Sequence, residues 1–351
     1  MVIDGRWTDG EHLRQDGHYV RQKSVFANRI DERTLAALRD EPQRFVLVAS
    51  YSCQWSHRAL VARALKGLAP ALQVQMAHGP LIEGYAVNGG RRWRIPGSDR
   101  EIIHLHELYT KGDPNYSGRS TVPVLWDSAR QKVVSNESSA IFEALDRIAD
   151  PADATAFVLE PASVSAGNDR VHALVTEMEQ LKTKIYDGLA NGVYRAGFAE
   201  SQPAYDEAVV DVFATLDVLE ERLSRRRYLM GSVLTSVDWY LFPTLVRFDA
   251  VYHILHRCCL RRLIDYPHLW AYARDLYSWQ GIAETVDFDQ IRSASYGNDT
   301  MVNPHGIVAI APDADWRAPH GRDRFGPAQV LLGNGTRMSV DPATFNTPSG
   351  D

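Results

Sequence analysis

Cys53 is the residue whose type and position most directly indicate chemistry. It follows residues 44–50, a largely apolar run with β-branched side chains that predicts a buried strand. From residue 60 onwards the apolar residues share one helical face, so Cys53 is expected at the N-terminus of a helix. A thiol there faces unpaired N–H groups and the positive end of the helix dipole, which favour the nucleophilic thiolate, and His57 and Arg58 add positive charge. Position alone leaves an alternative open, because most cysteines are buried and act only as small hydrophobic residues.

Pro123 predicts a second group that could bind a peptide-like thiol beside Cys53. It enters a strand expected over residues 120–126, where a proline loses one ladder hydrogen bond. If the peptide bond before Pro123 is cis, Val122 offers a free backbone N–H and C=O to an extended thiol peptide. An ordinary trans-proline is the alternative, and it is the commoner state of such a bond.

Glu137 and Ser138 lie at the entrance of a helix expected over residues 138–148. The Ser138 hydroxyl and the backbone N–H groups there can hold a carboxylate, while Glu137 can hold an ammonium group. Together they suit the head group of an α-amino acid. A simple helix cap is the alternative.

The surrounding pattern predicts an α/β domain followed by an all-helical one. The strand at 44–50, the helix after Cys53 and a second strand at 72–77 form a unit that should be parallel. A glycine-rich loop at 79–99 follows. The predicted segments are a leader (1–43), an α/β domain (44–150), a linker (151–161), an all-helical domain (162–296) and a Pro/Gly-rich extension (297–351).

The second half carries the periodicity of amphipathic helices. Thr235 to Asp238 is a capping-box pattern before an apolar run, and residues 268–277 predict a further helix. The extension is expected to wrap the body or to be partly disordered. An apolar seam recurs at spacings of three and four through Val209, Val212, Leu216, Leu219 and Leu223.

The composition excludes several classes of protein. The net charge of -6 over 351 residues argues against general nucleic-acid binding, and no apolar run approaches the ~20 residues of a membrane-spanning helix. Three cysteines are too few for a disulfide framework and lack zinc-ligand spacing, so we expect no metal and a reducing, cytoplasmic setting. Cys258 and Cys259 are expected to be buried thiols at a basic helix end.

The segment from Tyr51 to Arg58 resembles the Cys-Pro-Trp-Ala-His-Arg signature of the xi-class glutathione transferases, the glutathionyl-hydroquinone reductases. The resemblance covers roughly residues 20–322. It is specific because several separate segments match the family in the same order along the chain. The other matching segments are residues 113–119, 121–126, 136–139, 191–198, 245–249 and 303–304.

The resemblance implies a thioredoxin-like N-terminal domain, an all-helical glutathione-transferase C-terminal domain, and a homodimer assembled through the helical domains. Family members remove glutathione from glutathionyl-hydroquinones. The cysteine attacks the sulfur of the conjugate, hydroquinone leaves, and a second glutathione resolves the mixed disulfide. Cys53 is then the expected nucleophile, glutathione the co-substrate, and an aromatic or quinone-derived small molecule the partner. Neither nucleic acid nor a membrane is an expected partner.

The resemblance also implies roles for five residues in binding glutathione. Val122 would pair its backbone with the cysteinyl part, and Glu137 and Ser138 would hold the γ-glutamyl head. Arg119 would bind a carboxylate, because its guanidinium matches one at two points. Trp93, in the long loop, would be an aromatic wall.

Tyr194 and Tyr296 match family tyrosines that contact the aromatic substrate. Packed core or interface tyrosines are the alternative reading of both. The resemblance therefore places one predicted substrate contact in the first part of the helical half and one at its end.

Two positions beside Cys53 depart from the signature. Gln54 stands where the family has proline, and Ser56 stands where it has alanine. Neither removes the thiol, but both could alter its pKa, the pocket or the preferred substrate. The long loop also carries a basic segment at 89–92, either a solvated loop or a lid for an acidic or larger conjugate. A specialised thiol transferase of another pathway and a non-catalytic glutathione-binding scaffold therefore stay open as alternatives.

Overall fold

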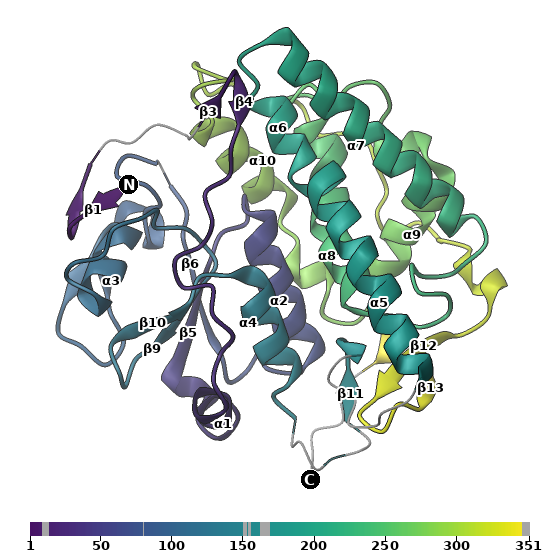
Figure 1. Cartoon of the computed structure of the whole chain (residues 1–351), viewed down its shortest axis with the longest axis horizontal. Coiled ribbons are helices and arrows are strands. Elements are labelled where there is room, and N and C mark those ends of the chain that lie inside the picture. Colours follow the sequence, from purple (N-terminus) through teal and green to yellow (C-terminus); the bar gives the residue numbers. More distant parts are fainter. Residues whose placement is uncertain (9–13, 80, 150–152, 154–155, 162–168, 346–351) are drawn as a thin grey trace.

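The computed structural model describes residues 1–8, 14–79, 81–149, 153, 156–161 and 169–345. Its first half is built on a four-stranded sheet with strand order β10-β9-β5-β6 (Figure 1). β5 (Phe45–Ala49) and β6 (Gln73–Met76) are parallel and are connected through α2 (Gln54–Leu65), which confirms the predicted strand–helix–strand unit. β9 (Val124–Asp127) and β10 (Lys132–Ser135) complete the sheet as antiparallel strands.

β5 is apolar throughout because both faces of the sheet are covered. Its first, third and fifth residues pack in the cluster that contains α2 and α4 (Ser138–Asp146). Val46 and Val48 pack on the opposite face, in the cluster that contains α3 (Leu105–Gly112). Successive side chains of a strand point to opposite faces, so a strand covered on both needs no polar alternation.

The leader and the long loop are more regular than expected. α1 (Glu32–Asp40) lies at the end of the leader, and β7 (Trp93–Arg94) pairs with β8 (Glu101–Ile102) in the loop region. Strands of two residues leave no periodic signal in a sequence, which is why they were not predicted. The leader's two hairpins are β1 (Val2–Ile3) with β2 (Arg6–Trp7), and β3 (Arg14–Gln15) with β4 (His18–Tyr19).

The second half is helical, as predicted. The helices are α5 (Asp169–Lys184), α6 (Gly192–Gly197), α7 (Gln202–Leu223), α8 (Ser236–Arg247), α9 (Pro267–Tyr277) and α10 (Phe288–Asn298). The predicted seam lies on α7, where four of its five residues are buried and Val209 is partly buried. Thr235 and Asp238 form the predicted capping box of α8. α2 packs directly against α8, so the two halves share one hydrophobic core.

The described part of the C-terminal extension packs against the helical half. β12 (Ala328–Leu332) pairs with β13 (Arg337–Val340) and with β11 (Phe157–Val158). β11 falls in the segment predicted as a linker, part of which lies outside the described residues. Its two residues form a strand because their pairing partner comes from the far end of the chain.

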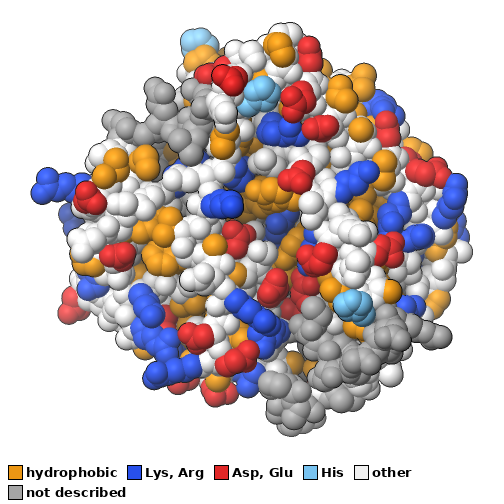
Figure 2. Space-filling model, viewed as in Figure 1, with side chains coloured by type: hydrophobic (Ala, Val, Ile, Leu, Met, Phe, Trp, Pro, Cys, Tyr) orange, Lys and Arg blue, Asp and Glu red, His pale blue; other side chains and the backbone are white. Residues whose placement is uncertain are grey.

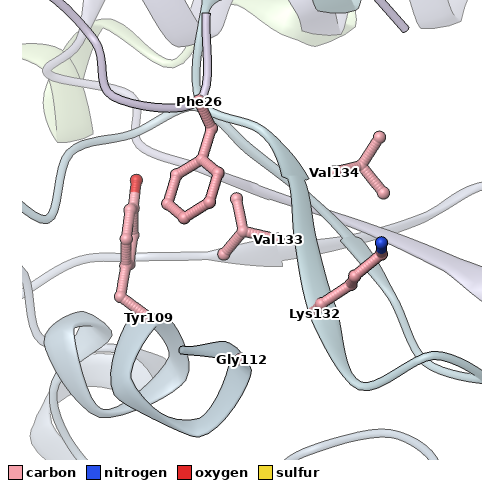
Figure 3. A pocket seen from close by; sticks show the side chains of 6 residues that line it. All are labelled: Phe26, Tyr109, Gly112, Lys132, Val133 and Val134. Carbon is pink, nitrogen blue, oxygen red and sulfur yellow. The ribbon is translucent and has the colours of Figure 1, made fainter. Parts of the chain in front are cut away.

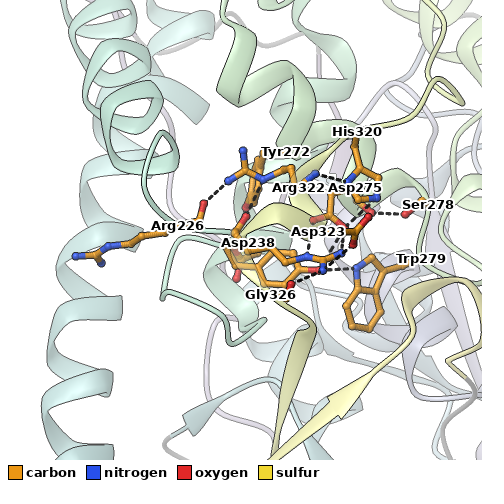
Figure 4. A network of polar contacts seen from close by, with 12 residues as sticks. Arg226, Asp238, Tyr272, Asp275, Ser278, Trp279, His320, Arg322, Asp323 and Gly326 are labelled. Carbon is orange, nitrogen blue, oxygen red and sulfur yellow. Dashed lines mark hydrogen bonds and ion pairs between the residues drawn. The ribbon is translucent and has the colours of Figure 1, made fainter.

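A buried polar network anchors this extension (Figure 4). Arg227 donates from Nε and Nη2 to the Asp275 carboxylate at 2.9 and 3.1 Å, and from Nη1 to the Gly326 carbonyl at 2.9 Å. Arg322, from the extension, donates to the carbonyls of Leu223 and Arg227 at 3.0 Å each. Leu223 is the last residue of α7, whose final carbonyls have no partner within the helix, and Arg227 follows in the connection to α8.

The expectation for the paired cysteines was half right. Cys258 is buried, and burial raises its pKa to about 12, but Cys259 is exposed. Neither lies in a helix, so consecutive side chains here need not share one environment. Among the described residues no cluster of three or more histidine, cysteine or acidic side chains could hold a metal ion. None of the described helices has both the length and the apolar character needed to span a bilayer.

Candidate active site

Cys53 lies at the N-terminus of α2, as the sequence predicted. It is the N-cap residue, and its Sγ accepts a hydrogen bond from the Ser56 N–H at 3.3 Å. The thiol also donates to the Val122 carbonyl at 3.4 Å, and the Val122–Pro123 peptide bond is cis. Cys53 is 7% exposed. The structure therefore brings together the cysteine, the helix terminus and the proline loop that the sequence singled out.

Glu137 is the N-cap residue of α4, on the same edge of the sheet as the proline loop. Its carboxylate accepts from the Ser139 N–H at 3.3 Å and from the Ser139 hydroxyl at 3.2 Å. Ser138 is buried beside it. A third donor comes from the leader, where the Ser24 hydroxyl lies 2.9 Å from Glu137 Oε2. The leader is thus part of this site, which sequence reasoning missed.

Tyr85 and Trp93 of the long loop both pack against the core cluster that contains Cys53 and Val122. Burial, and then the nearby Cys53 and Tyr194, raise the pKa of Tyr85, while Arg119 opposes that rise. Tyr85 is therefore near both Arg119 and the cysteine. Trp93 pairs with Ile102 in the β7–β8 hairpin. Its role as an aromatic wall stays a prediction. Tyr85 was not singled out in the sequence.

Tyr194 and Tyr252 face Cys53 from the helical half. Their hydroxyls lie 3.5 Å apart, and their rings pack edge to face with centroids 5.8 Å apart. Burial, and then Cys53, raise the pKa of Tyr194, so its phenol stays protonated near neutral pH. Tyr252 was not singled out in the sequence. Tyr296 is 3% exposed in α10, and among the described residues neither a hydrogen-bond partner of its hydroxyl nor a link to Cys53 is found.

A separate cavity of about 270 Å³ lies between α3 and β10 (Figure 3). It holds none of the predicted site residues, and Val133 and Tyr109 in its wall belong to the core cluster on the α3 side of the sheet. Its lining residues are Phe26, Tyr109, Gly112, Lys132, Val133 and Val134. Figure 2 shows hydrophobic, basic and acidic side chains close together near the centre of the view, where the two halves meet. We therefore assign the candidate site to the surroundings of Cys53.

Comparison with known proteins decides the family. Residues 52–148 match the glutathione S-transferase N-terminal domain, and residues 202–275 match the C-terminal domain. The chain is 40% identical over 340 residues to glutathionyl-hydroquinone reductase YqjG of Escherichia coli, covering 93% of this chain and 99% of that protein. It is 39% identical over 321 residues to glutathionyl-hydroquinone reductase PcpF of Sphingobium chlorophenolicum, covering 89% and 96%. The chain belongs to the Xi-class glutathione transferase family.

Solved structures agree with this assignment. An Xi-class transferase from Natrialba magadii has a TM-score of 0.79 at 37% identity, covering 92% of this chain and 96% of that chain. The glutathione-bound structure of YqjG from Escherichia coli has a TM-score of 0.75 at 39% identity, covering 92% and 99%. The thioredoxin-like first half and helical second half of this Xi-class transferase are those of its family.

A buried arginine supports the segment before the cysteine. Arg247, at the end of α8, is 1% exposed and donates to the Tyr51 carbonyl at 2.6 Å and to His57 Nδ1 at 3.0 Å. The Thr285 hydroxyl donates to the Ile282 carbonyl at 2.6 Å, so it must accept from His57 Nε2 at 2.8 Å. His57 is therefore the neutral Nε2–H tautomer, and its Nδ1 is free to accept from the arginine.

This arrangement predicts a pH dependence of stability. Burial, and then Arg247, hold the pKa of His57 well below 6.5, so the native state stays neutral while the unfolded chain gains a proton below about pH 6.5. The unfolded state then binds more protons than the native state, so the free energy of unfolding decreases as the pH is lowered. Between pH 7.5 and 5.0 we expect the wild type to lose about 1–2 kcal/mol more than His57→Gln does, measured by urea unfolding. Replacing the exposed His305 by glutamine should keep the wild-type slope, and equal slopes in wild type and His57→Gln would contradict the assignment.

The two departures from the family signature face the protein interior. Gln54 is 1% exposed, donates to the Ala190 carbonyl at 2.8 Å and accepts a hydrogen bond from the Thr244 hydroxyl. Its side chain thus joins α2 to the helical half instead of extending toward a substrate. Ser56 is fully buried, and no hydrogen-bond partner of its hydroxyl is found among the described residues.

We expect Gln54→Ala to lower the free energy of unfolding by about 2–3 kcal/mol, because the Ala190 carbonyl and the Thr244 hydroxyl both lose a buried partner. Chemical denaturation followed by tryptophan fluorescence measures this. The exposed Gln290, also in the first turn of a helix, is the matched control, and its alanine variant should stay within about 0.5 kcal/mol of wild type. A Gln54→Ala variant as stable as that control would show that the bridge contributes nothing.

Proposed function

We propose that this Xi-class transferase removes glutathione from glutathionyl-hydroquinones through a mixed disulfide between Cys53 and glutathione. The observation that carries the proposal is the position of the Cys53 sulfur. It accepts from the first turn of α2 and contacts the Val122 carbonyl, while protonated phenols face it from the helical half. The names of the relatives YqjG and PcpF, both glutathionyl-hydroquinone reductases, support the same activity.

The first half of the molecule supplies the proposed glutathione site. Val122 would pair its backbone with the cysteinyl part of the tripeptide, next to the Cys53 sulfur. Glu137 and Ser138, at the N-terminus of α4, would hold the γ-glutamyl head. Arg119 would bind a glutathione carboxylate through its guanidinium. Trp93 remains the aromatic wall proposed from the resemblance, and Tyr85, which packs against the same core cluster, is a second candidate for it.

The second half supplies the proposed site for the aromatic group. In its ketone tautomer the substrate carries glutathione on the carbon next to a carbonyl. The Cys53 thiolate attacks the glutathione sulfur, an S–S bond forms, and the C–S bond breaks. The electron pair moves through the ring to the carbonyl oxygen, which becomes the phenolate of the hydroquinone. Tyr194 is a protonated phenol next to the cysteine, so it can supply a proton to that oxygen.

A second glutathione completes the cycle. Its thiolate attacks the glutathione sulfur of the mixed disulfide and releases Cys53 and oxidised glutathione. The ring is reduced by two electrons in the first step; over the cycle the thioether sulfur of the conjugate and the thiol sulfur of one glutathione are oxidised to one disulfide. Tyr296 is proposed as a further contact of the aromatic substrate.

We also propose a homodimer assembled through the helical halves and a cytoplasmic location. Three free cysteines support a reducing compartment. Analytical ultracentrifugation tests the dimer.

The function is tested by incubating the protein with a glutathionyl-hydroquinone and analysing both products. We expect intact-protein mass spectrometry to find one glutathione on Cys53 and chromatography to find free hydroquinone. Release of hydroquinone should then become catalytic when glutathione is added. If the protein binds glutathione but never forms the adduct, the proposed activity is wrong, and the protein is the non-catalytic scaffold named above as an alternative.

A further inference from the structure

The leader crosses the junction between the two halves and is fastened to both. Figure 1 shows it as a dark purple trace that runs from β4, beside α6, down to α1. The Phe26 N–H donates to Asn136 Oδ1 at 3.0 Å, and the Asn136 N–H donates back to the Phe26 carbonyl at 3.3 Å. At its other end Arg21 donates from Nε to Asn191 Oδ1 at 2.9 Å, next to α6. These contacts hold Arg21 in a fixed place over the site.

Arg21 lies among the aromatic groups that face the cysteine. Its guanidinium carbon is 4.8 Å from the centroid of the Tyr194 ring and 5.0 Å from that of the Trp55 ring. It also interacts electrostatically with the Cys53 sulfur. Arg21 thus contacts two residues of the helical half, Tyr194 and Asn191, next to Cys53.

Three arginines interact electrostatically with Cys53, and Arg21 differs from the other two. Arg58 is 5% exposed and Arg247 is 1% exposed, so neither can reach a ligand. Arg21 is partly exposed, and among the described residues no acidic group forms an ion pair with it. Cations in such surroundings normally have a counter-charge, because an unpaired one loses solvation without compensation. Here a ligand can supply the anion.

The proposed reaction produces an anion close to the Cys53 sulfur. As the C–S bond breaks, negative charge develops on the hydroquinone oxygen. A fixed cation at that oxygen stabilises the transition state more than the neutral ground state, and so raises the rate. The Tyr194 phenol, packed against the Arg21 guanidinium, is placed to give its proton to the same oxygen.

We propose that Arg21 forms an oxyanion-binding subsite that holds the phenolate oxygen of the leaving hydroquinone. This inference rests on the proposed function. The subsite is specific for oxygen-bearing aromatic leaving groups, because it has no role when the bond broken is S–S rather than C–S. Arg21 therefore acts in the first half of the cycle and not in the second.

The test compares two reactions in each variant. One is release of hydroquinone from a glutathionyl-hydroquinone, and the other is reduction of a preformed Cys53–glutathione disulfide by glutathione. We expect Arg21→Met to lower kcat of the first about 10- to 100-fold, since the subsite is partly open to water, and to change the second less than about twofold. Arg21→Lys should lie between Arg21→Met and wild type. Lys23→Met removes the same charge from an exposed position of the leader and should match the wild type in both.

The ratio of the two rates within one variant does not depend on how much of the protein is folded, so a destabilised variant still gives an answer. An unchanged ratio in Arg21→Met overturns the inference. A raised KM for glutathione in the second reaction also overturns it, because Arg21 would then hold a glutathione carboxylate. If the wild type forms no adduct and releases no hydroquinone, the proposed function itself fails, which is a result distinct from both.

Discussion

Cys53→Ser lowers the rate of hydroquinone release at least about 10³-fold, because a serine hydroxyl neither ionises near neutral pH nor forms a disulfide with glutathione. The substitution preserves shape at a position that is 7% exposed, so the fold and the hydrogen bond from Ser56 should persist. Stopped-flow absorbance of the released hydroquinone measures the rate. Intact-protein mass spectrometry should at the same time show that the glutathione adduct is gone.

The control for this variant is Cys259→Ser. Cys259 is an exposed thiol outside the site, so its replacement should leave the rate unchanged and should remove any adventitious adduct. If Cys53→Ser retained turnover within tenfold of wild type, the mixed disulfide could not be an intermediate. The fold and family would stand, but the mechanism would have to use another nucleophile.

The largest expected effect on stability comes from the buried pair of Arg227 and Asp275. The Arg227 side chain is only 2% exposed. Replacing Asp275 by alanine removes the carboxylate that binds this cation at two points. Breaking a buried pair by removing one partner costs about 3–5 kcal/mol, so we expect a loss of that size in the free energy of unfolding. Tyr228 would also lose the acceptor that lies 3.3 Å from its hydroxyl.

Urea unfolding of Asp275→Ala and of Glu221→Ala compares the loss of a buried carboxylate with the loss of an exposed one, both paired with an arginine. Glu221 pairs with Arg225 one helical turn away, and both side chains are mostly exposed, so its removal should cost no more than about 0.5 kcal/mol. The Arg227→Met, Asp275→Leu double variant should recover part of the loss, because the Arg227 cation is then no longer buried without its bidentate partner. A loss for Asp275→Ala as small as that for Glu221→Ala would mean that the ion pair with Asp323, 2.9 Å from Arg227 Nη1, is enough to compensate the cation.

The predictions that succeeded rest on local pattern. The apolar run of β5, the change of period after Cys53 and the capping box at Thr235 are each readable within about a dozen residues. The family resemblance then placed Cys53, Val122 and Glu137 in one site, and the structure brings their elements together. The roles of these residues toward glutathione remain predictions.

The features that sequence reasoning missed depend on contacts between distant segments. Arg21 and Ser24 lie in a leader without periodicity, and only the folded chain shows that they reach residues 191 and 137. Tyr85 lies in a glycine-rich loop whose path no local signal defines. The sequence left open whether Gln54 alters the thiol, the pocket or the substrate; only the folded chain shows that its side chain bonds to Ala190 and Thr244, far along the chain.

The bridge made by Gln54 has a consequence for how this chain can be recombined with its relatives. Gln54 belongs to the first half by sequence, but its hydrogen-bonding partners belong to the second. A chimera cut between α4 and α5 would place a foreign residue opposite Thr244 and leave a buried hydroxyl and carbonyl unmatched. The natural unit of exchange in this protein is therefore the second half together with α2.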